Sequence, residues 1–141
     1  MSREIKFRGR RLDNLEWVYG YLVVDPEGGY RIYWKPFDEA TSNTYHFVIP
    51  ETVGQFTSLP DKNRSEIYEG DIMYQRYFDK LEESGYGETF LQIAFKDGAF
   101  GWIGDITGQF FSFAEQPLDD YEIIGNIYEH PHLLTPSPTK Q

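Results

Sequence analysis

The stretch that decides the fold reads Thr89-Phe-Leu-Gln-Ile-Ala-Phe95, then Lys96-Asp-Gly98, then Ala99-Phe-Gly-Trp-Ile103. Its first and last segments are rich in aromatic and β-branched residues, which suit the pleated surface of a strand. The Asp-Gly pair between them is a hairpin turn signal. The stretch therefore predicts two antiparallel strands joined by a tight turn.

Similar short segments lie on both sides of this hairpin. An N-terminal strand is indicated by Ile5 and Phe7, which alternate with charged residues. Many short strands between Gly and Pro turns are typical of an all-β sandwich or barrel. We therefore expect a mainly β fold, a small partly open barrel or sandwich built from antiparallel hairpins, with at most one or two short helices. Further strands are predicted at 16–24, 30–34, 45–49, 52–57, 109–113 and 121–128.

The chain is expected to form a single β-rich domain over residues 1–132, with possible subdomains 1–58 and 59–132. Residues 133–141, which contain two prolines, are expected to be a mobile tail. Residues 73–83 allow two interpretations. Met73, Tyr74, Tyr77, Phe78 and Leu81 have helical spacing, which favours a helix, whereas the alternative is a strand that runs into a polar excursion.

Composition excludes several classes of protein. The 141 residues include no cysteine, which excludes disulfides, thiolate zinc sites and thiol catalysis. No run of about 18 apolar residues is present, and the N-terminus has no apolar core typical of a signal peptide. We expect a cytoplasmic protein of the host cell, with no membrane partner.

Charge is distributed unevenly along the chain. Against a formal net charge of -10, residues 1–70 hold 9 basic and 11 acidic side chains, and residues 71–141 hold 4 and 12. An acidic chain repels phosphate backbones, so a nucleic-acid partner is not expected. A basic cluster near the N-terminus could contact an anion, but we favour a solvated strand face. The cluster comprises Arg3, Lys6, Arg8, Arg10 and Arg11.

Three segments, Arg3–Arg8, Glu51–Met73 and Tyr121–Leu134, resemble the YopX family of phage and prophage proteins. The resemblance implies a small, β-rich, phage-borne protein and implies no particular activity. Ser58 and Arg64 stand where the family often has glycine, and Pro60 stands where it has a basic residue. Because Asn63 tolerates a left-handed backbone, we expect the hairpin at this point to survive.

The strongest local motif is Glu69-Gly70-Asp71. On an extended strand, Glu69 and Asp71 would share one face and could bind a cation or act as acid and base. The interpretation we favour is structural: Asp71 bonds the backbone of a bend made by Gly70, and Glu69 faces water.

Other chemical motifs are weak. His130 and His132 with Glu129 resemble a fragment of a metal site, but a zinc site needs three or four ligands, and the one further histidine is His46. We therefore expect an exposed loop, no metal and no cofactor. The glycine-rich run 98–104 matches no phosphate-binding pattern.

Aromatic residues are the most unusual feature of the composition. Trp17, Tyr19 and Tyr21 alternate and share a strand face. Together with Tyr30 and Trp34 they could form a stacking platform for single-stranded nucleic acid. We favour a core or a protein interface, where aromatic residues are enriched. Trp17, Tyr19, Tyr21 and Trp34 are thus the candidate interaction surface.

The sequence favours a non-catalytic accessory protein that acts through contacts with a host or phage protein, and that self-associates as a homo-oligomer. Two alternatives remain: an enzyme or small-ligand binder that uses Glu69 and Asp71, and a mimic of DNA that occupies a host DNA-binding protein. The carboxylates of such a mimic would be Asp71, Asp79, Glu82, Glu83, Glu88, Asp119, Asp120 and Glu122.

Overall fold

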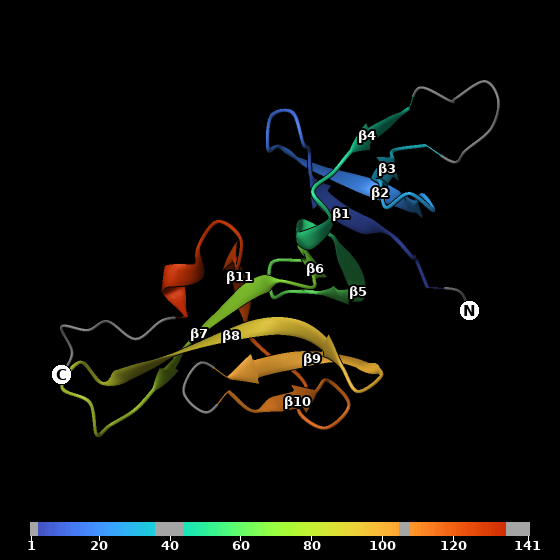
Figure 1. Ribbon diagram of the computed structural model, residues 1–141. Coiled ribbons are helices and arrows are strands. Elements are labelled where there is room, and N and C mark those ends of the chain that lie inside the picture. Colours follow the sequence, from blue (N-terminus) through green and yellow to red (C-terminus); the bar gives the residue numbers. More distant parts are fainter. Residues whose placement is uncertain (1–2, 36–43, 105–107, 135–141) are drawn as a thin grey trace. The chain divides into compact units, whose positions relative to one another are not determined.

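The computed structural model describes residues 3–35, 44–104 and 108–134 (Figure 1). In these ranges the helical segments are two short 3₁₀ turns, and no helix is long and apolar enough to cross a membrane. Most of the predicted tail 133–141 lies outside the described residues. The elements are β1 (Phe7–Arg10), β2 (Trp17–Val24), β3 (Tyr30–Tyr33), β4 (Tyr45–Phe47), η2 (Pro50–Thr52), β5 (Gly54–Pro60), β6 (Glu66–Tyr68), β7 (Asp71–Phe78), β8 (Tyr86–Lys96), β9 (Ala99–Gly104), β10 (Phe110–Ser112), β11 (Glu122–Asn126) and η3 (Pro131–Leu133).

The strands form two open antiparallel sheets. The six-stranded sheet has the order β4-β3-β2-β1-β5-β6, and the five-stranded sheet has the order β10-β9-β8-β7-β11. The mainly β prediction, with antiparallel hairpins and at most two short helices, is confirmed. Neither sheet closes on itself as a barrel.

By its internal contacts the chain divides into two compact units, Met1–Ser58 (unit 1) and Leu59–Gln141 (unit 2). In unit 1, three successive hairpins join β1 to β4. Its buried apolar residues include Ile32 and Val48. Gly9 lets the backbone of β1 approach them, since a Cβ there would lie 3.1 Å from Cβ of Val48.

In unit 2, the predicted hairpin around Asp97 is formed by β8 and β9. β7 pairs on one side with β8, the next strand along the chain, and on the other side with β11, which is distant in sequence. Beneath them lies a cluster of buried side chains, Ile67, Met73, Leu91 and Ile93. Partly buried residues that pack against this cluster are Trp102, Phe113, Leu118, Tyr121 and Ile123.

The helix favoured for residues 73–83 is wrong. Residues 71–78 are strand β7, and 86–96 are strand β8, with a turn between them. The helical stripe was misleading because it was not a buried face: Met73 is fully buried, whereas Phe78 and Leu81 are among the most exposed apolar residues. Tyr and Phe also favour strands where a cross-strand partner is available.

Candidate functional site

The Glu69-Gly70-Asp71 motif forms the bend between β6 and β7. Gly70 has φ +90°, in the region that favours glycine, and its N–H donates a 2.8 Å hydrogen bond to the carbonyl oxygen of Ile93. The Asp71 side chain is 1% exposed, and its Oδ2 accepts a 2.7 Å hydrogen bond from the N–H of Tyr68. Asp71 therefore ties the two ends of the bend together.

Glu69 and Asp71 do not lie on one extended strand. Glu69 belongs to the turn and β7 begins at Asp71, so the alternation that would place both carboxylates on one face does not apply. Neither residue lines the hollow around Tyr19, Tyr21 and Trp34 or the apolar hollow above Ile67. Across residues 3–35, 44–104 and 108–134, no three His, Asp or Glu side chains gather as metal ligands would.

The basic residues of β1 pack against Trp17. The guanidinium carbon of Arg8 lies 4.7 Å from the centre of a Trp17 ring, and that of Arg10 lies 5.9 Å from it. Arg8 is buried and Trp17 is half-buried. These cation–π contacts account for Trp17 without an external ligand, and Trp17 is the least open member of the candidate interaction surface.

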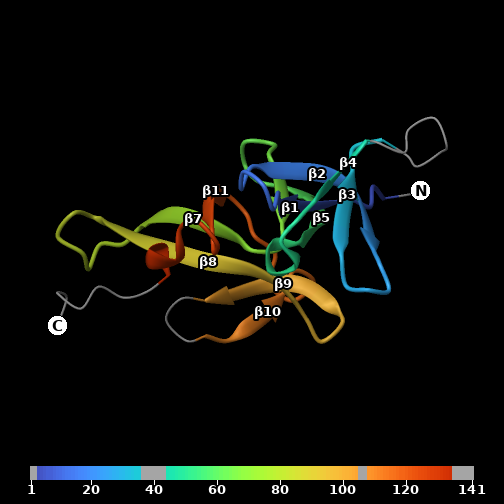
Figure 2. The same cartoon turned by 45° about the horizontal axis from the view of Figure 1, so that its top comes forward.

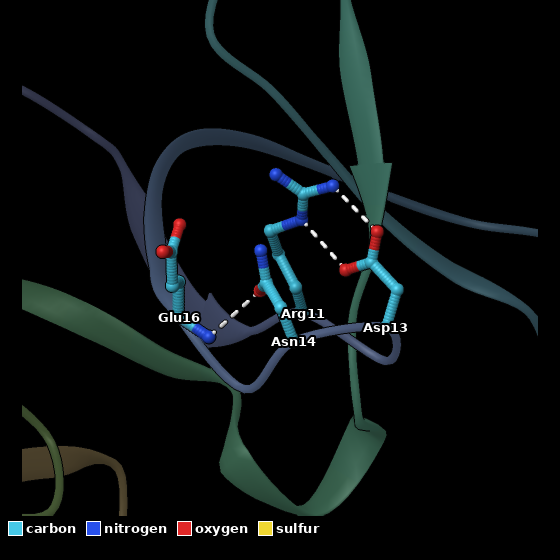
Figure 3. A network of polar contacts seen from close by, with 4 residues as sticks. All are labelled: Arg11, Asp13, Asn14 and Glu16. Carbon is cyan, nitrogen blue, oxygen red and sulfur yellow. Dashed lines mark hydrogen bonds and ion pairs between the residues drawn. The ribbon is translucent and has the colours of Figure 1, made fainter.

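The next basic residue is engaged in the turn between β1 and β2 (Figure 3). Nε and Nη2 of Arg11 donate to the two carboxylate oxygens of Asp13 at 2.8 and 2.6 Å. These hydrogen bonds lower the pKa of Asp13 and raise the pKa of Arg11. In the same turn the Asn14 side-chain oxygen accepts a 2.9 Å hydrogen bond from the N–H of Glu16. Arg11 therefore forms a local ion pair with Asp13.

Tyr19, Tyr21 and Trp34 come together around one hollow of about 340 Å³ in unit 1. Each of the three aromatic side chains is close to half exposed. Glu4 and Lys6 also line the hollow, and their charged groups pair at 3.4 Å. Of the four predicted interaction residues, these three are the ones that form an open surface.

The histidines do not form a shared site. His130 and His132 have ring centres 6.3 Å apart. The Nδ1 atom of His130 accepts a 3.1 Å hydrogen bond from the N–H of Asn126, which occupies that lone pair. His46 lies elsewhere, in unit 1, stacked 4.7 Å from Trp34.

An additional surface that the sequence did not indicate is the outer half of the β7–β8 hairpin. β11 pairs with β7 only as far as Glu122↔Tyr74, and β9 pairs with β8 only from Leu91↔Gly104. Beyond these points, in the described part of the chain, the two strands pair with each other alone. We call residues 75–90 the arm; its end extends past β9 and β11 in both views (Figure 1, Figure 2).

The arm is held by side chains that pack across its two strands. Arg76 lies over the ring of Tyr86 at 4.0 Å, and Phe78 meets the same ring edge-on at 6.2 Å. Tyr77 covers Gly87, where a Cβ would lie 2.4 Å from the ring. Such cross-strand pairs each contribute about 0.2–1 kcal/mol, which explains how an isolated ribbon keeps its register.

The end of the arm exposes two apolar side chains among charged ones. Phe78 is 73% exposed and Leu81 is 90% exposed. This surface was not predicted from the sequence, because Phe78 and Leu81 also fit the spacing of a helix over residues 73–83. The signal that could have found it is the pair of glycines, Gly85 and Gly87, placed after two apolar residues that no alternating pattern buries.

Comparison with known proteins identifies the family. The YopX protein family model matches residues 6–135. The chain belongs to the YopX family. Among solved structures, it is similar to protein EF1440 from Enterococcus faecalis, with 26% sequence identity and a TM-score of 0.60 over 95% of this chain and 100% of that chain. No curated protein matches the sequence.

Two departures from the YopX pattern have a structural counterpart. Ser58 and Arg64, which stand where the family often has glycine, have φ of 72° and 68°. The expected hairpin is present between β5 and β6, and Oδ1 of Asp61 accepts hydrogen bonds from the N–H groups of Asn63 and Ser65. The left-handed residue in this turn is Arg64, one position later than expected.

Proposed function

We propose that this YopX-family chain is a phage or prophage accessory protein that acts through non-catalytic contacts with another protein. The observation that carries the proposal is the arm, whose end presents Phe78 and Leu81 to solvent. An isolated two-stranded ribbon is only marginally stable in water, so a partner that covers these two apolar side chains would stabilise the arm.

The charge of unit 2 supports a basic partner. Residues 59–141 contain 6 basic and 15 acidic side chains, a balance of -9, whereas residues 1–58 contain 7 and 8. The acidic residues of the arm, Asp79, Glu82, Glu83 and Glu88, outnumber its basic residues, Arg76 and Lys80. Opposite charge would steer a basic partner to this unit, while Phe78 and Leu81 would supply apolar contact area.

Mimicry of DNA is the second candidate function, because the same carboxylates favour a DNA-binding protein as the partner. One residue must be removed from the predicted mimic surface: Asp71 is buried and bonded within the bend. The same burial weakens the enzyme alternative, which relied on Asp71 being available together with Glu69. A protein contact therefore remains the function that the geometry supports best.

The experiment is a capture from nuclease-treated host lysate with three tagged proteins: the natural chain, the arm variant Phe78→Ser/Leu81→Ser, and a control variant. The control, Leu12→Ser/Val24→Ser, alters two exposed apolar residues of unit 1 that do not line the hollow around Tyr19, Tyr21 and Trp34. We expect a protein that the natural chain and the control capture and the arm variant loses. Equal capture by the arm variant would exclude the arm as the contact surface.

Self-association must be separated from this result. The expected homo-oligomer remains a proposal, and a second copy is the alternative occupant of the arm. Light scattering on the purified chain distinguishes the two. A mass that falls to the monomer value in the arm variant assigns the arm to self-association instead of to a foreign partner.

A further inference from the structure

Unit 2 contains an apolar hollow of about 390 Å³ that the arm does not use. Its base includes the buried core residue Ile67. This volume is at the lower end of the range for ligand pockets, and its lining, predominantly apolar with a few polar groups, is typical of them. The lining residues are Leu59, Pro60, Ile67, Phe113, Ala114, Pro117, Leu118 and Asp119.

The wall formed by residues 113–119 is fixed by contacts of its own. Phe113 and Leu118 pack against the core cluster of unit 2. Nε1 of Trp102 donates a 2.9 Å hydrogen bond to the carbonyl oxygen of Gln116, and the N–H of Gln116 donates to the carbonyl oxygen of Ser112. These contacts position residues 113–119 before any ligand binds, so binding does not have to order this segment.

Asp119 is the charged residue among those that line the hollow. It is exposed, and its position is fixed because Nε2 of Gln75 donates a 3.2 Å hydrogen bond to its backbone carbonyl oxygen. Asp120 follows it and is also exposed, in a unit with a charge balance of -9. The apolar hollow thus has an acidic rim, and an anionic occupant would be repelled.

We infer that this hollow receives one large apolar side chain of a peptide segment in which the neighbouring residue is Lys or Arg. The apolar side chain fills the space above Ile67, and the cationic group pairs with the carboxylate of Asp119. The volume suits one anchor side chain, and the acidic rim selects the charge of its neighbour. The inference goes beyond the arm contact and does not depend on it.

The test uses three capped dipeptide amides as probes: acetyl-Phe-Lys-amide, acetyl-Phe-Glu-amide and acetyl-Gly-Lys-amide. Each is titrated into the ¹⁵N-labelled full chain and followed by amide chemical shifts. We expect saturable shifts at Leu59, at 113–116 and at 118–119 with Phe-Lys, and weaker binding of the other two. Equal binding of Phe-Lys and Phe-Glu, or no shifts around the hollow, would overturn the inference.

Variants test the acidic group and the apolar hollow of the site separately. Asp119→Asn keeps the shape, removes the charge, and should raise the Kd of Phe-Lys roughly two- to fivefold, the range of an exposed ion pair. Ala114→Phe, at an exposed position, should fill the hollow and abolish the shifts. The matched control Asp97→Asn removes one charge from the β8–β9 turn, where Asn tolerates the positive φ, and should bind like the natural chain.

The arm variant Phe78→Ser/Leu81→Ser keeps this test distinct from the proposed function. It should bind Phe-Lys as the natural chain does, even if its lysate partner is lost. If the natural chain captures its partner but shows no peptide shifts, the hollow is excluded and the arm contact stands.

Discussion

Ser58 and Arg64 hold a backbone conformation that glycine adopts at least cost. Strain at an L-residue with φ near +70° lowers the free energy of unfolding by about 1–2 kcal/mol. Glycine removes this strain, but part of the gain is lost because an unfolded chain with an added glycine has greater conformational freedom. We expect Ser58→Gly and Arg64→Gly each to raise the free energy of unfolding by about 0.5–1 kcal/mol. Urea denaturation measures this. The control Ser65→Gly, where φ is not positive, should lower it.

At the same scale, Asp71 is expected to matter for stability more than Glu69. Replacement of Asp71 by alanine leaves the N–H of Tyr68 buried without the acceptor that it has now, a loss of roughly 1–3 kcal/mol. Glu69→Ala, in the half-exposed turn, should cost less than about 1 kcal/mol. The same denaturation measurement compares them. A larger loss for Glu69→Ala would contradict the structural role given to Asp71.

His46 makes the stability of unit 1 depend on pH. Burial, and then the charge of Arg11, lower the pKa of His46 below its ordinary 6.5, against weaker opposing effects of Asp13 and Glu16. As the pH falls through 6.5, the unfolded chain takes up a proton that the folded chain does not. Stability is therefore lost on the acid side.

The consequence is measurable as a difference between two proteins. Between pH 7.5 and pH 5, the melting temperature of the natural chain should fall further than that of His46→Gln, which has no proton to gain at this position. Thermal melts followed by circular dichroism provide the comparison. Equal falls for the two proteins would show that His46 titrates alike in both states.

Among the elements, β9 and β10 approach each other through a glycine. A Cβ on Gly101 would lie 2.2 Å from the carbonyl oxygen of Phe111 and 2.7 Å from Cα of Ser112, both backbone atoms that cannot move aside singly. Gly101→Ala should cost about 1–3 kcal/mol, the range for overpacking. Hydrogen exchange should accelerate at residues 110–112 and remain slow at Ile72 and Gln92 in the β7–β8 pair.

Gly98→Ala is the control for this prediction. Gly98 has a positive φ, unlike Gly101, and none of the described residues, its two chain neighbours aside, lies within 4 Å of a Cβ placed there. Its replacement should therefore cost backbone strain alone, about 1 kcal/mol, and should leave the exchange of 110–112 unchanged. If both variants release β10 equally, the close approach at Gly101 is not the cause.

Elements that are specified by neighbouring residues in the chain could be predicted from the sequence. The β8–β9 hairpin follows from strand propensity and an Asp-Gly turn, and the start of β7 follows from the Gly70-Asp71 bend. The arm could not be predicted, because Tyr77 on Gly87 and Arg76 on Tyr86 are contacts between strands, and one strand read alone does not show its partner. The pairing of β11 with β7 is hidden for the same reason.

For the molecule as a whole, the two units differ in charge far more than in size. This difference predicts that a basic polymer retains the protein and that an acidic polymer does not. At 0.15 M salt the natural chain should bind a polylysine resin and pass through heparin. At 1 M salt, where the screening length falls from about 8 to about 3 Å, it should leave polylysine. If heparin retained the protein, nucleic acid would again have to be considered as a partner.

The candidate site was predicted only in part, and the molecule's organisation explains why. Composition indicated that aromatic residues are the unusual feature, and Tyr19, Tyr21 and Trp34 do surround a hollow. Trp17 does not join them, because Arg8 and Arg10 from the neighbouring strand cover it. The hollow of unit 2 combines residues from 59 to 119, and no single stretch carries its pattern.

The outer edge of β7 beyond Tyr74, which pairs with no other strand in the described part of the chain, also affects how the protein should be stored. At neutral pH, mutual repulsion between molecules of charge -10 keeps such edges apart. Near the isoelectric point, pH 4.6, that protection vanishes, and the edge, beside the exposed Phe78 and Leu81, becomes a template on which another copy can add a strand. Concentrated stocks will keep best well above this pH, while crystallisation trials just above it will favour lattices built through the arm.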